Sequence, residues 1–284
     1  LMETPEASPH IRITRDGGVG VLTIDRPARF NSLDVQTARD LRKAGLQLAR
    51  DEQVRCLVVR GVNGVFCSGA DLKYIRGGGD PKDLGYLSPE ARGAQPGYGA
   101  IFKQILEYLH ATISELRRAP KPVIAAVDGV AAAGGLGLAM CCDLVVASER
   151  STFEYAYFKT ALSGAESSTF FLPKLVGLRR AMDLALLNPR LSAKEAKELG
   201  LVSQVLPDAA YEVELMSLAR RLAAGPTASY AAAKRLMNEA AGVDRLDYHL
   251  DRELEALARS ADSRDFSEGI TAFFEKRTPT FEGR

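Results

Sequence analysis

Apolar residues in the first half of the chain form short runs that either alternate with polar residues or stay hydrophobic throughout. Residues 11–14 alternate, and residues 19–24 follow the turn residues Asp16, Gly17 and Gly18, which predicts a β-hairpin. Later apolar runs are rich in β-branched residues and are typical of buried strands. These runs cover residues 54–60, 122–127, 144–148 and 152–153.

Between these runs, apolar residues recur every three to four positions, which is the pattern of helices packed on a core. Asp34 is an N-cap residue that predicts a helix reaching about Asp51, and residues 101–118 predict a longer helix before Pro120. Because strands and helices follow one another repeatedly, the pattern predicts an α/β core with helices outside it.

The chain changes character near Pro207, after which helix signals dominate. Ser192 and Glu195 form a capping box that opens a helix ending at Gly200, and residues 201–206 predict one last strand. Further helices are predicted over residues 208–224, 227–241, 244–260 and 265–276. We therefore expect a core over residues 1–206 and a helical C-terminal region over residues 207–284. This region is too small to bury its own faces, so it should pack on the core or on another subunit.

The stretch 121–143 organises the chain, because it combines a buried strand, the turn residues Asp128 and Gly129, and the pair Gly134-Gly135 that opens a buried helix. Glycine at a helix start allows a ligand to approach the backbone closely, and the first helical N–H groups have no internal partner. Such a helix start can hold an anionic oxygen. The alternative interpretation is a close-packed buried turn with no ligand.

Composition and charge narrow the classes of function. The chain has 284 residues, 46% apolar and 26% charged, and a net charge of +1, which argues against binding to nucleic acid or to an anionic membrane surface. No apolar run reaches the ~18 residues of a membrane span, and no secretory signal opens the sequence. The four cysteines sit in apolar runs without zinc-ligand spacing, so we expect reduced core residues in a cytoplasmic protein. The three histidines lie far apart, which argues against a histidine-based metal or nucleophile site.

Five segments of the chain carry recognisable motifs, namely residues 26–33, 66–72, 121–143, 191–202 and 268–277. In this order they resemble the crotonase, or enoyl-CoA hydratase/isomerase, superfamily over residues 11–284. Within the superfamily, residues 180–187 and 263–270 are most similar to the 1,2-epoxyphenylacetyl-CoA isomerase type.

The resemblance implies a spiral of repeated ββα units, C-terminal helices used in trimerisation, and a homotrimer or hexamer. It also implies an acyl-CoA thioester as substrate, with coenzyme A part of that substrate and no separate cofactor or metal. By the same resemblance, the N–H groups of Ala70 and Gly134 would form an oxyanion hole. The residues that it places near coenzyme A are Arg29, Ser68, Asp71, Leu72, Lys73, Phe273 and Lys276. An isolated lysine or arginine among these can equally be a solvated surface charge.

The two glutamates that the hydratases of this superfamily use are absent. Gly137 and Tyr157 stand at those positions, and neither is a suitable base near neutral pH. The aspartate of the isomerases falls on Ala165, but Glu166 follows directly and lies among small and apolar residues, where burial would raise its pKa. One carboxylate with an oxyanion hole suits a 1,3-proton shift, so we predict an enoyl-CoA double-bond isomerase in which Glu166 is the base and Tyr157 a helper.

Other interpretations remain open at this point. Glu166 can simply be a glutamate at a helix N-terminus, and Ser163 or Glu154 can assist instead. Hydratase, hydrolase or decarboxylase chemistry can recruit acids from the glycine-rich stretch 77–99, which is either a lid or a solvent loop. The acid candidates there are Asp80, Asp83, Tyr86 and Tyr98. A non-catalytic acyl-CoA-binding subunit is the interpretation from outside the enzymes.

Overall fold

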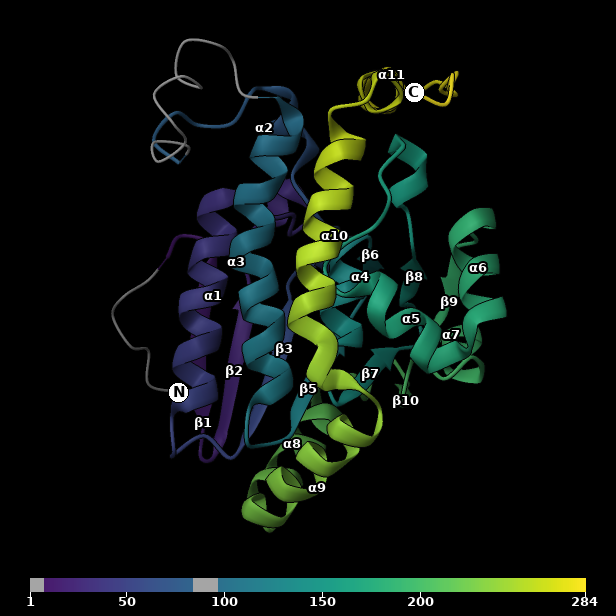
Figure 1. Ribbon diagram of the computed structural model, residues 1–284. Coiled ribbons are helices and arrows are strands. Elements are labelled where there is room, and N and C mark those ends of the chain that lie inside the picture. Colours follow the sequence, from purple (N-terminus) through teal and green to yellow (C-terminus); the bar gives the residue numbers. More distant parts are fainter. Residues whose placement is uncertain (1–7, 84–96) are drawn as a thin grey trace.

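The computed structural model describes residues 8–83 and 97–284, and the strands of these ranges form two sheets (Figure 1). The larger sheet has the order β1-β2-β3-β5-β7-β10 and the smaller one the order β4-β6-β8-β9. The strands are β1 Ile11–Asp16, β2 Val19–Ile24, β3 Cys56–Gly61, β4 Val65–Cys67, β5 Val123–Val127, β6 Val130–Ala132, β7 Leu144–Ser148, β8 Thr152–Glu154, β9 Leu191–Ser192 and β10 Gln204–Leu206. Only β1 with β2 and β8 with β9 pair antiparallel among them, and the other neighbours are parallel.

Helices pack around these sheets. They are α1 Val35–Arg50, α2 Leu72–Arg76, α3 Tyr98–Arg118, α4 Gly134–Met140, α5 Ser168–Val176, α6 Leu178–Leu187, α7 Ala193–Glu198, α8 Tyr211–Ala224, α9 Thr227–Ala240, α10 Leu246–Ala261 and α11 Arg264–Glu275, with the 3-10 turns η1 Pro27–Arg29, η3 Tyr157–Thr160 and η4 Val243–Arg245. The fully buried α4 contacts strands of both sheets. Two predicted starts are confirmed: the Asp34 side chain accepts from the N–H of Thr37, and Ser192 and Glu195 form a capping box.

A strand of the large sheet, a strand of the small sheet and a helix follow one another as a repeated unit. β5, β6 and α4 make one such unit, and β7, β8 and α5 make the next. The α/β spiral of ββα units expected from the sequence is therefore confirmed. The short strands β4, β6 and β9 and the helices α5 and α6 were not predicted.

Both faces of the large sheet are buried, since side chains along each strand alternate between two cores. On β3, Leu57 packs with the layer formed by α1 and α3, whereas Val58 packs against Leu215 and Ala219 of α8. The four cysteines are free and buried, as expected. α8 thus encloses the second sheet face, and the predicted packing of C-terminal helices on the core holds for this helix.

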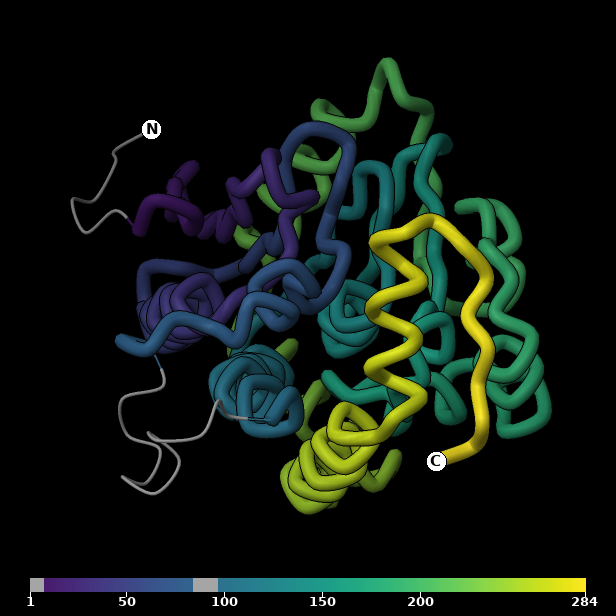
Figure 2. The backbone as a smooth tube through the Cα atoms, turned by 90° about the horizontal axis from the view of Figure 1, so that it is seen from above, coloured from purple at the N-terminus to yellow at the C-terminus, as the bar shows by residue number. Residues whose placement is uncertain are grey.

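The last two helices shape the end of the molecule where β4, β6 and β8 finish. α10 runs beside α3 (Figure 1), and α11 crosses the end nearest the viewer in Figure 2. α11 packs so tightly on η3 that a side chain at Gly269 would lie 2.8 Å from the Cα of Thr160. This contact brings the C-terminal region against the turn that carries Tyr157.

Part of the stretch 77–99 is described. Its residues 84–96, including Tyr86, lie outside the described ranges, while Tyr98 starts α3 and stacks edge-on against Phe266.

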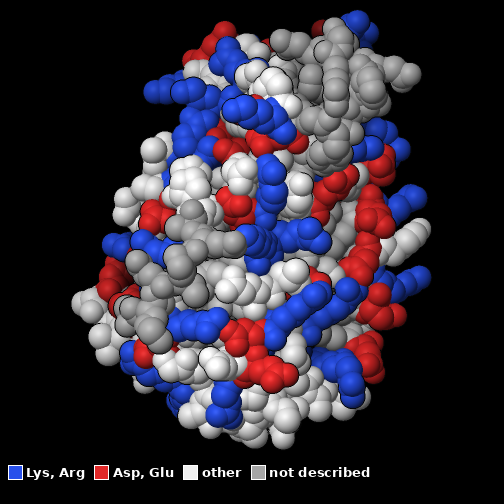
Figure 3. All heavy atoms as spheres, turned by 90° about the vertical axis from the view of Figure 1, so that its left-hand side faces the viewer, with Lys and Arg blue, Asp and Glu red and all other residues white. Residues whose placement is uncertain are grey.

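On the face shown in Figure 3, lysine and arginine alternate with aspartate and glutamate. Within the described ranges, no helix combines the length and hydrophobicity needed to cross a bilayer.

Candidate active site

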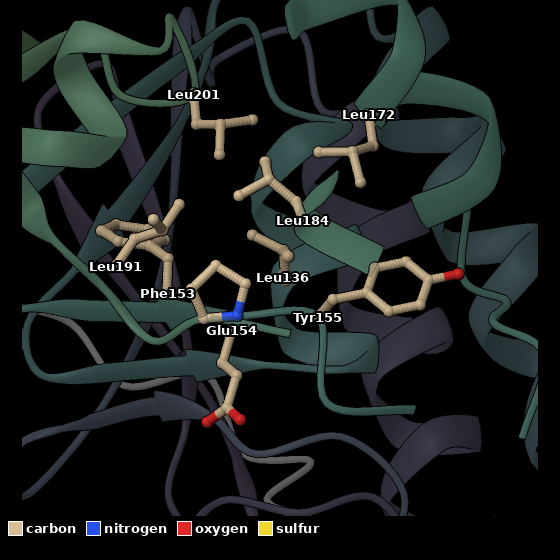
Figure 4. Close-up of a pocket in the computed structure, with 9 residues that line it drawn as sticks. Leu136, Phe153, Glu154, Tyr155, Leu172, Leu184, Leu191 and Leu201 are labelled. Atoms are coloured by element: carbon tan, nitrogen blue, oxygen red, sulfur yellow. The ribbon is translucent and has the colours of Figure 1, made fainter. Parts of the chain in front are cut away.

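A cavity of about 390 Å3 lies among η1, α2, the ends of β6 and β8, η3, and the helices α10 and α11. Apolar walls come from Phe102, Leu162 and Leu257, and cations come from Arg29 and Lys73. A neighbouring hollow of about 10 Å3 lies among leucines on the other side of β8 and holds at most one water. Figure 4 shows the Glu154 carboxylate pointing away from those leucines. Of these two spaces, the larger cavity can admit an organic substrate.

Ala132 and Ala133, directly before the helix start predicted at Gly134, line this cavity, whereas Gly134 is buried and is not part of the lining within the described ranges. Ala133, which precedes α4, has φ 47 and ψ −120, a conformation that non-glycine residues adopt rarely and that is typical of functional sites. The first helical bond of α4 runs from the N–H of Gly137 to the carbonyl of Ala133, so the N–H of Gly134 takes no part in it.

The segment that carries Ala70 lies against this helix start. Gly69 accepts from Leu33 and Asp71 donates to Leu33, so the N–H of Ala70 between them points to the opposite side. A side chain at Gly69 would lie 3.1 Å from the N atom of Gly134. Two backbone N–H groups are therefore close together at the cavity wall, an arrangement that can bind an anionic oxygen.

Glu166 brings a carboxyl group to the same place. Its side chain is 2% exposed and lines the cavity, and a side chain at Gly134 would lie 2.9 Å from its Oε1 atom. Burial raises the pKa of Glu166 to about 8; a hydrogen bond from Tyr157 acts in the opposite direction, and the charge of Glu253 adds to the rise. Glu166 precedes α5 by two residues, so it is not within the helix.

Tyr157 is the partner of this carboxyl. Its hydroxyl lies 2.9 Å from the carbonyl of Ala165 and hydrogen-bonds Oε2 of Glu166, while its ring is buried. Burial raises the pKa of Tyr157 well above its usual range, and the negative charge of Glu166 raises it further. The hydroxyl has one proton, so it donates to Glu166 when that group is ionised and to Ala165 when Glu166 is protonated.

Gly137 occupies its position for a steric reason. A side chain there would lie 2.0 Å from the carbonyl oxygen of Glu166, which no real Cβ atom tolerates. The hydroxyl of Ser167 also lies 3.3 Å from the carbonyl of Gly137. The turn that carries Glu166 thus fills the space that a glutamate at position 137 would need.

Most residues expected near coenzyme A line the cavity. Arg29, Ser68, Lys73 and Phe273 do so, whereas Lys276, the C-cap of α11, is not part of the lining within the described ranges. The remaining two of the set, Asp71 and Leu72, also line it.

Asp71 has a largely internal role. Its carboxylate is 3% exposed, pairs with Arg26 and Arg29, and caps α2 through the N–H groups of Lys73 and Tyr74. Burial would raise the pKa of Asp71, but the hydrogen bonds from Arg29, Tyr74 and Arg26 outweigh it and hold the pKa below its usual range. Asp71 therefore orients Arg29 at the cavity edge.

A second carboxylate lines the cavity at the end of β8. Glu154 accepts from the amide of Asn188 at 2.9 Å, forms an ion pair with Lys159, and lies 3.4 Å from the guanidinium of Arg190. The sequence suggested Glu154 as a helper but not these partners, since they lie up to 36 residues away. Asp83, a candidate from the stretch 77–99, instead bonds Arg39 and Tyr74.

Two buried polar residues near Glu166 were not recognised as part of the site. The N–H of Glu166 donates to Nε2 of His110 at 3.1 Å, and the N–H of Ser167 donates to Glu253 at 2.7 Å. Glu253 interrupts the apolar stripe of Leu246, Leu250 and Leu257 on α10, and this interruption was the available signal. No cluster of metal-binding side chains occurs within the described ranges.

The chain is similar to known proteins over most of its length. The profile of the family described as Enoyl-CoA hydratase/isomerase matches residues 14–284. The chain is 36% identical to the 1,2-epoxyphenylacetyl-CoA isomerase of Escherichia coli (strain K12), covering 94% of this chain and 96% of that protein.

Two further similarities cover nearly the whole chain. The chain is 35% identical to the mitochondrial methylglutaconyl-CoA hydratase of Homo sapiens, over 94% of this chain and 74% of that one. A crystal structure of an enoyl-CoA hydratase from Mycobacterium avium subsp. paratuberculosis superposes with a TM-score of 0.82 at 32% identity, covering 96% and 98% of the two chains. Relatives named for isomerisation and for hydration thus share this fold.

Proposed function

The chain belongs to the enoyl-CoA hydratase/isomerase family, and on that premise we propose that it is an acyl-CoA double-bond isomerase that works with one carboxylate. The observation that carries this proposal is the buried carboxyl of Glu166, which lies beside Gly134 and is held by Tyr157. The substrate is an enoyl thioester of coenzyme A, and coenzyme A enters as part of that substrate.

The proposed reaction is a 1,3-proton shift. The thioester oxygen accepts hydrogen bonds from the N–H groups of Ala70 and Gly134, each worth about 3 kcal/mol when negative charge develops on that oxygen. Glu166 removes a proton from the α carbon of a 3-enoyl thioester, and the electron pair of the broken C–H bond enters a dienolate. The same carboxyl returns the proton to the γ carbon, and the double bond forms between the α and β carbons.

The environment of Glu166 suits this exchange. Burial raises the pKa of its carboxyl to about 8, which makes the carboxylate a stronger base than an exposed glutamate. The base must be ionised to act, so turnover should rise with pH up to about 8. Tyr157 orients the carboxyl through its hydroxyl, and Gly137 leaves room for the turn that carries it.

Hydration is the second candidate, because Glu154 provides another carboxylate at the same cavity. Two carboxylates could divide the work of activating water and delivering a proton. The carboxylate of Glu154 is already engaged by Asn188, Lys159 and Arg190, whereas the carboxyl of Glu166 lies beside Gly134. Isomerisation is therefore favoured.

The deciding experiment uses a panel of 2-enoyl and 3-enoyl thioesters of coenzyme A in deuterated water, read by mass spectrometry. Isomerisation predicts a shifted double bond and incorporated deuterium with no added water. Glu166→Gln should lose at least about 100-fold in kcat, whereas Glu255→Gln, an exposed residue of α10, is the matched control. A product heavier by one water would favour hydration, and full turnover by Glu166→Gln would refute the proposal.

We also propose that Arg29, Ser68, Lys73 and Phe273 contact the coenzyme A part of the substrate. Their position on the cavity lining supports this assignment, and Asp71 holds Arg29 in place. Lys276 would join them only if the end of α11 moves or a neighbouring subunit supplies it.

Self-association as a homotrimer or hexamer is proposed as well. α6 exposes the apolar side chains of Leu178, Met182, Leu186 and Leu187, and such a surface is typical of a subunit interface. Sedimentation velocity of the purified protein tests this proposal, and a monomer across the micromolar range would refute it.

A further inference from the structure

The turn that carries Glu166 has an unusual backbone. Glu166 and the next residue, Ser167, have φ values of 52 and 63, so two successive non-glycine residues are left-handed directly before α5. Residues other than glycine adopt this conformation rarely, and it persists only when surrounding contacts hold it. The conformation decides where the Glu166 side chain points, since Cα of Glu166 lies inside the turn.

The first of these contacts comes from α3. The imidazole of His110 accepts the N–H of Glu166 at its Nε2 atom, at 3.1 Å. Accepting requires that this nitrogen carries no proton, and burial lowers the pKa of His110 to about 3, so the ring stays neutral. The His110 side chain is therefore a permanent acceptor for the Glu166 amide.

The second contact comes from α10. The Glu253 carboxylate accepts the N–H of Ser167 at 2.7 Å and both the N–H and the hydroxyl of Thr169, at 2.9 and 2.5 Å. Nε2 of His249, one turn before Glu253 on α10, lies 2.8 Å from the same Thr169 hydroxyl. Glu253 thus supplies from another helix the N-terminal cap that α5 lacks in its own sequence.

Together these contacts bind the two amides of the left-handed pair, and the two acceptors lie side by side, with Nε2 of His110 3.8 Å from Oε2 of Glu253. We infer that His110 and Glu253 are positioning residues that hold the turn so that the Glu166 carboxyl faces the N–H groups of Ala70 and Gly134. His110 and Glu253 are 6% and 3% exposed and are not part of the cavity lining, so they act through Glu166 rather than on the substrate. This inference rests on the proposed role of Glu166 as the base.

A graded set of variants tests the inference with the thioester that the parent protein converts. His110→Leu removes the acceptor and should lower kcat by about 10- to 100-fold, because a misplacement of about 1 Å is enough for such a loss. KM should stay within about threefold, since the carboxyl contributes to the chemical step rather than to binding. His110→Gln restores an acceptor oxygen and should recover most of the lost turnover.

Glu253 gives a second series of variants. Glu253→Gln keeps one acceptor oxygen and should lower kcat less than Glu253→Leu, which keeps none. Thr112→Val is the matched control for His110→Leu, because Thr112 is a buried polar residue of the same helix, α3, and its hydroxyl donates to the carbonyl of Tyr108 on that helix. Should His110→Leu fail to fold by circular dichroism and thermal unfolding, the comparison of Glu253→Gln with the parent decides.

The double variant separates positioning from general damage. With Glu166→Gln already present, His110→Leu should cause no further loss of kcat, since the residue acts only through the carboxyl. An equal further loss in that background, or an unchanged kcat in His110→Leu alone, would overturn the inference. Full turnover by Glu166→Gln alone would instead refute the proposed function, so the two failures are distinguishable.

Discussion

Replacing Glu166 by glutamine should lower kcat at least about 100-fold and, at neutral pH, make the protein more stable. The carboxyl is buried, and its pKa in the folded protein is raised from 4.5 to about 8. In the unfolded chain it ionises near the ordinary value. Between these two pKa values the folded protein keeps a proton on Glu166 that the unfolded chain has already released. The free energy of unfolding therefore falls as pH rises through this interval.

The magnitude follows from this difference in pKa. The contribution of a neutral Glu166 to stability is fully present below about pH 4.5, is lost progressively as pH rises, and levels off above about pH 8. At pH 7 the loss is about 3 kcal/mol, since about 2.5 pH units have been crossed at roughly 1.4 kcal/mol each. Glutamine has the same shape and cannot ionise, so it avoids this loss.

Urea denaturation of the parent and of Glu166→Gln at a series of pH values from about 4.5 to 8 measures the effect. Protein concentration is kept constant, since self-association would shift the midpoint. Burial raises the pKa of Glu253 to about 7, and this group titrates in both proteins. Its contribution to the free energy of unfolding therefore largely cancels when the two proteins are compared. We expect the stability difference in favour of Glu166→Gln to grow by about 3 kcal/mol between pH 4.5 and pH 7.

A difference that stays constant across this pH range would refute the reasoning. It would mean that the folded protein solvates the Glu166 carboxylate as well as water does. A rise of turnover with pH up to about 8 would then be unexplained too. If the stability difference grows as expected but turnover persists, the carboxyl is buried but is not the base.

Three further predictions concern the surroundings of this carboxyl. Tyr157→Phe removes the hydrogen bond that lowers the pKa of Glu166, so the rising limb of kcat/KM against pH should move above about 8. Gly137→Ala places a methyl group 2.0 Å from the Glu166 carbonyl, so turnover should be lost and urea denaturation should show a loss of about 1 to 3 kcal/mol. Asp71→Asn removes the buried carboxylate that two arginines share, and the same measurement should show a loss of about 3 kcal/mol.

Each of these has its own contrary outcome. A pH limb that stays in place in Tyr157→Phe would show that the hydroxyl does not act on the carboxyl. Gly18→Ala is the control for Gly137→Ala, because a methyl group at Gly18 meets its nearest neighbour at 3.4 Å, and equal losses would remove the steric interpretation. Unchanged stability in Asp71→Asn would mean that the arginines find other partners.

Much of the fold could be predicted from the sequence because the signals are local. The cap at Asp34, the capping box at Ser192 and the glycine pair at Gly134 each act within about four residues of themselves. The short strands β4, β6 and β9 were missed, since two or three residues are too few to reveal alternation. Their hydrogen bonds join segments far apart in the chain, which no local pattern reports.

The sequence by itself determined the α/β class, the glycine-opened helix and the loss of carboxylates at Gly137 and Tyr157. The family resemblance also singled out Glu166, which follows the aligned position Ala165, but not the direction of its side chain. Only the tertiary structure decided that direction, because His110 and Glu253 hold the turn from 56 and 86 residues away along the chain. A left-handed backbone at a glutamate is unfavourable on its own, so contacts between distant helices must stabilise it.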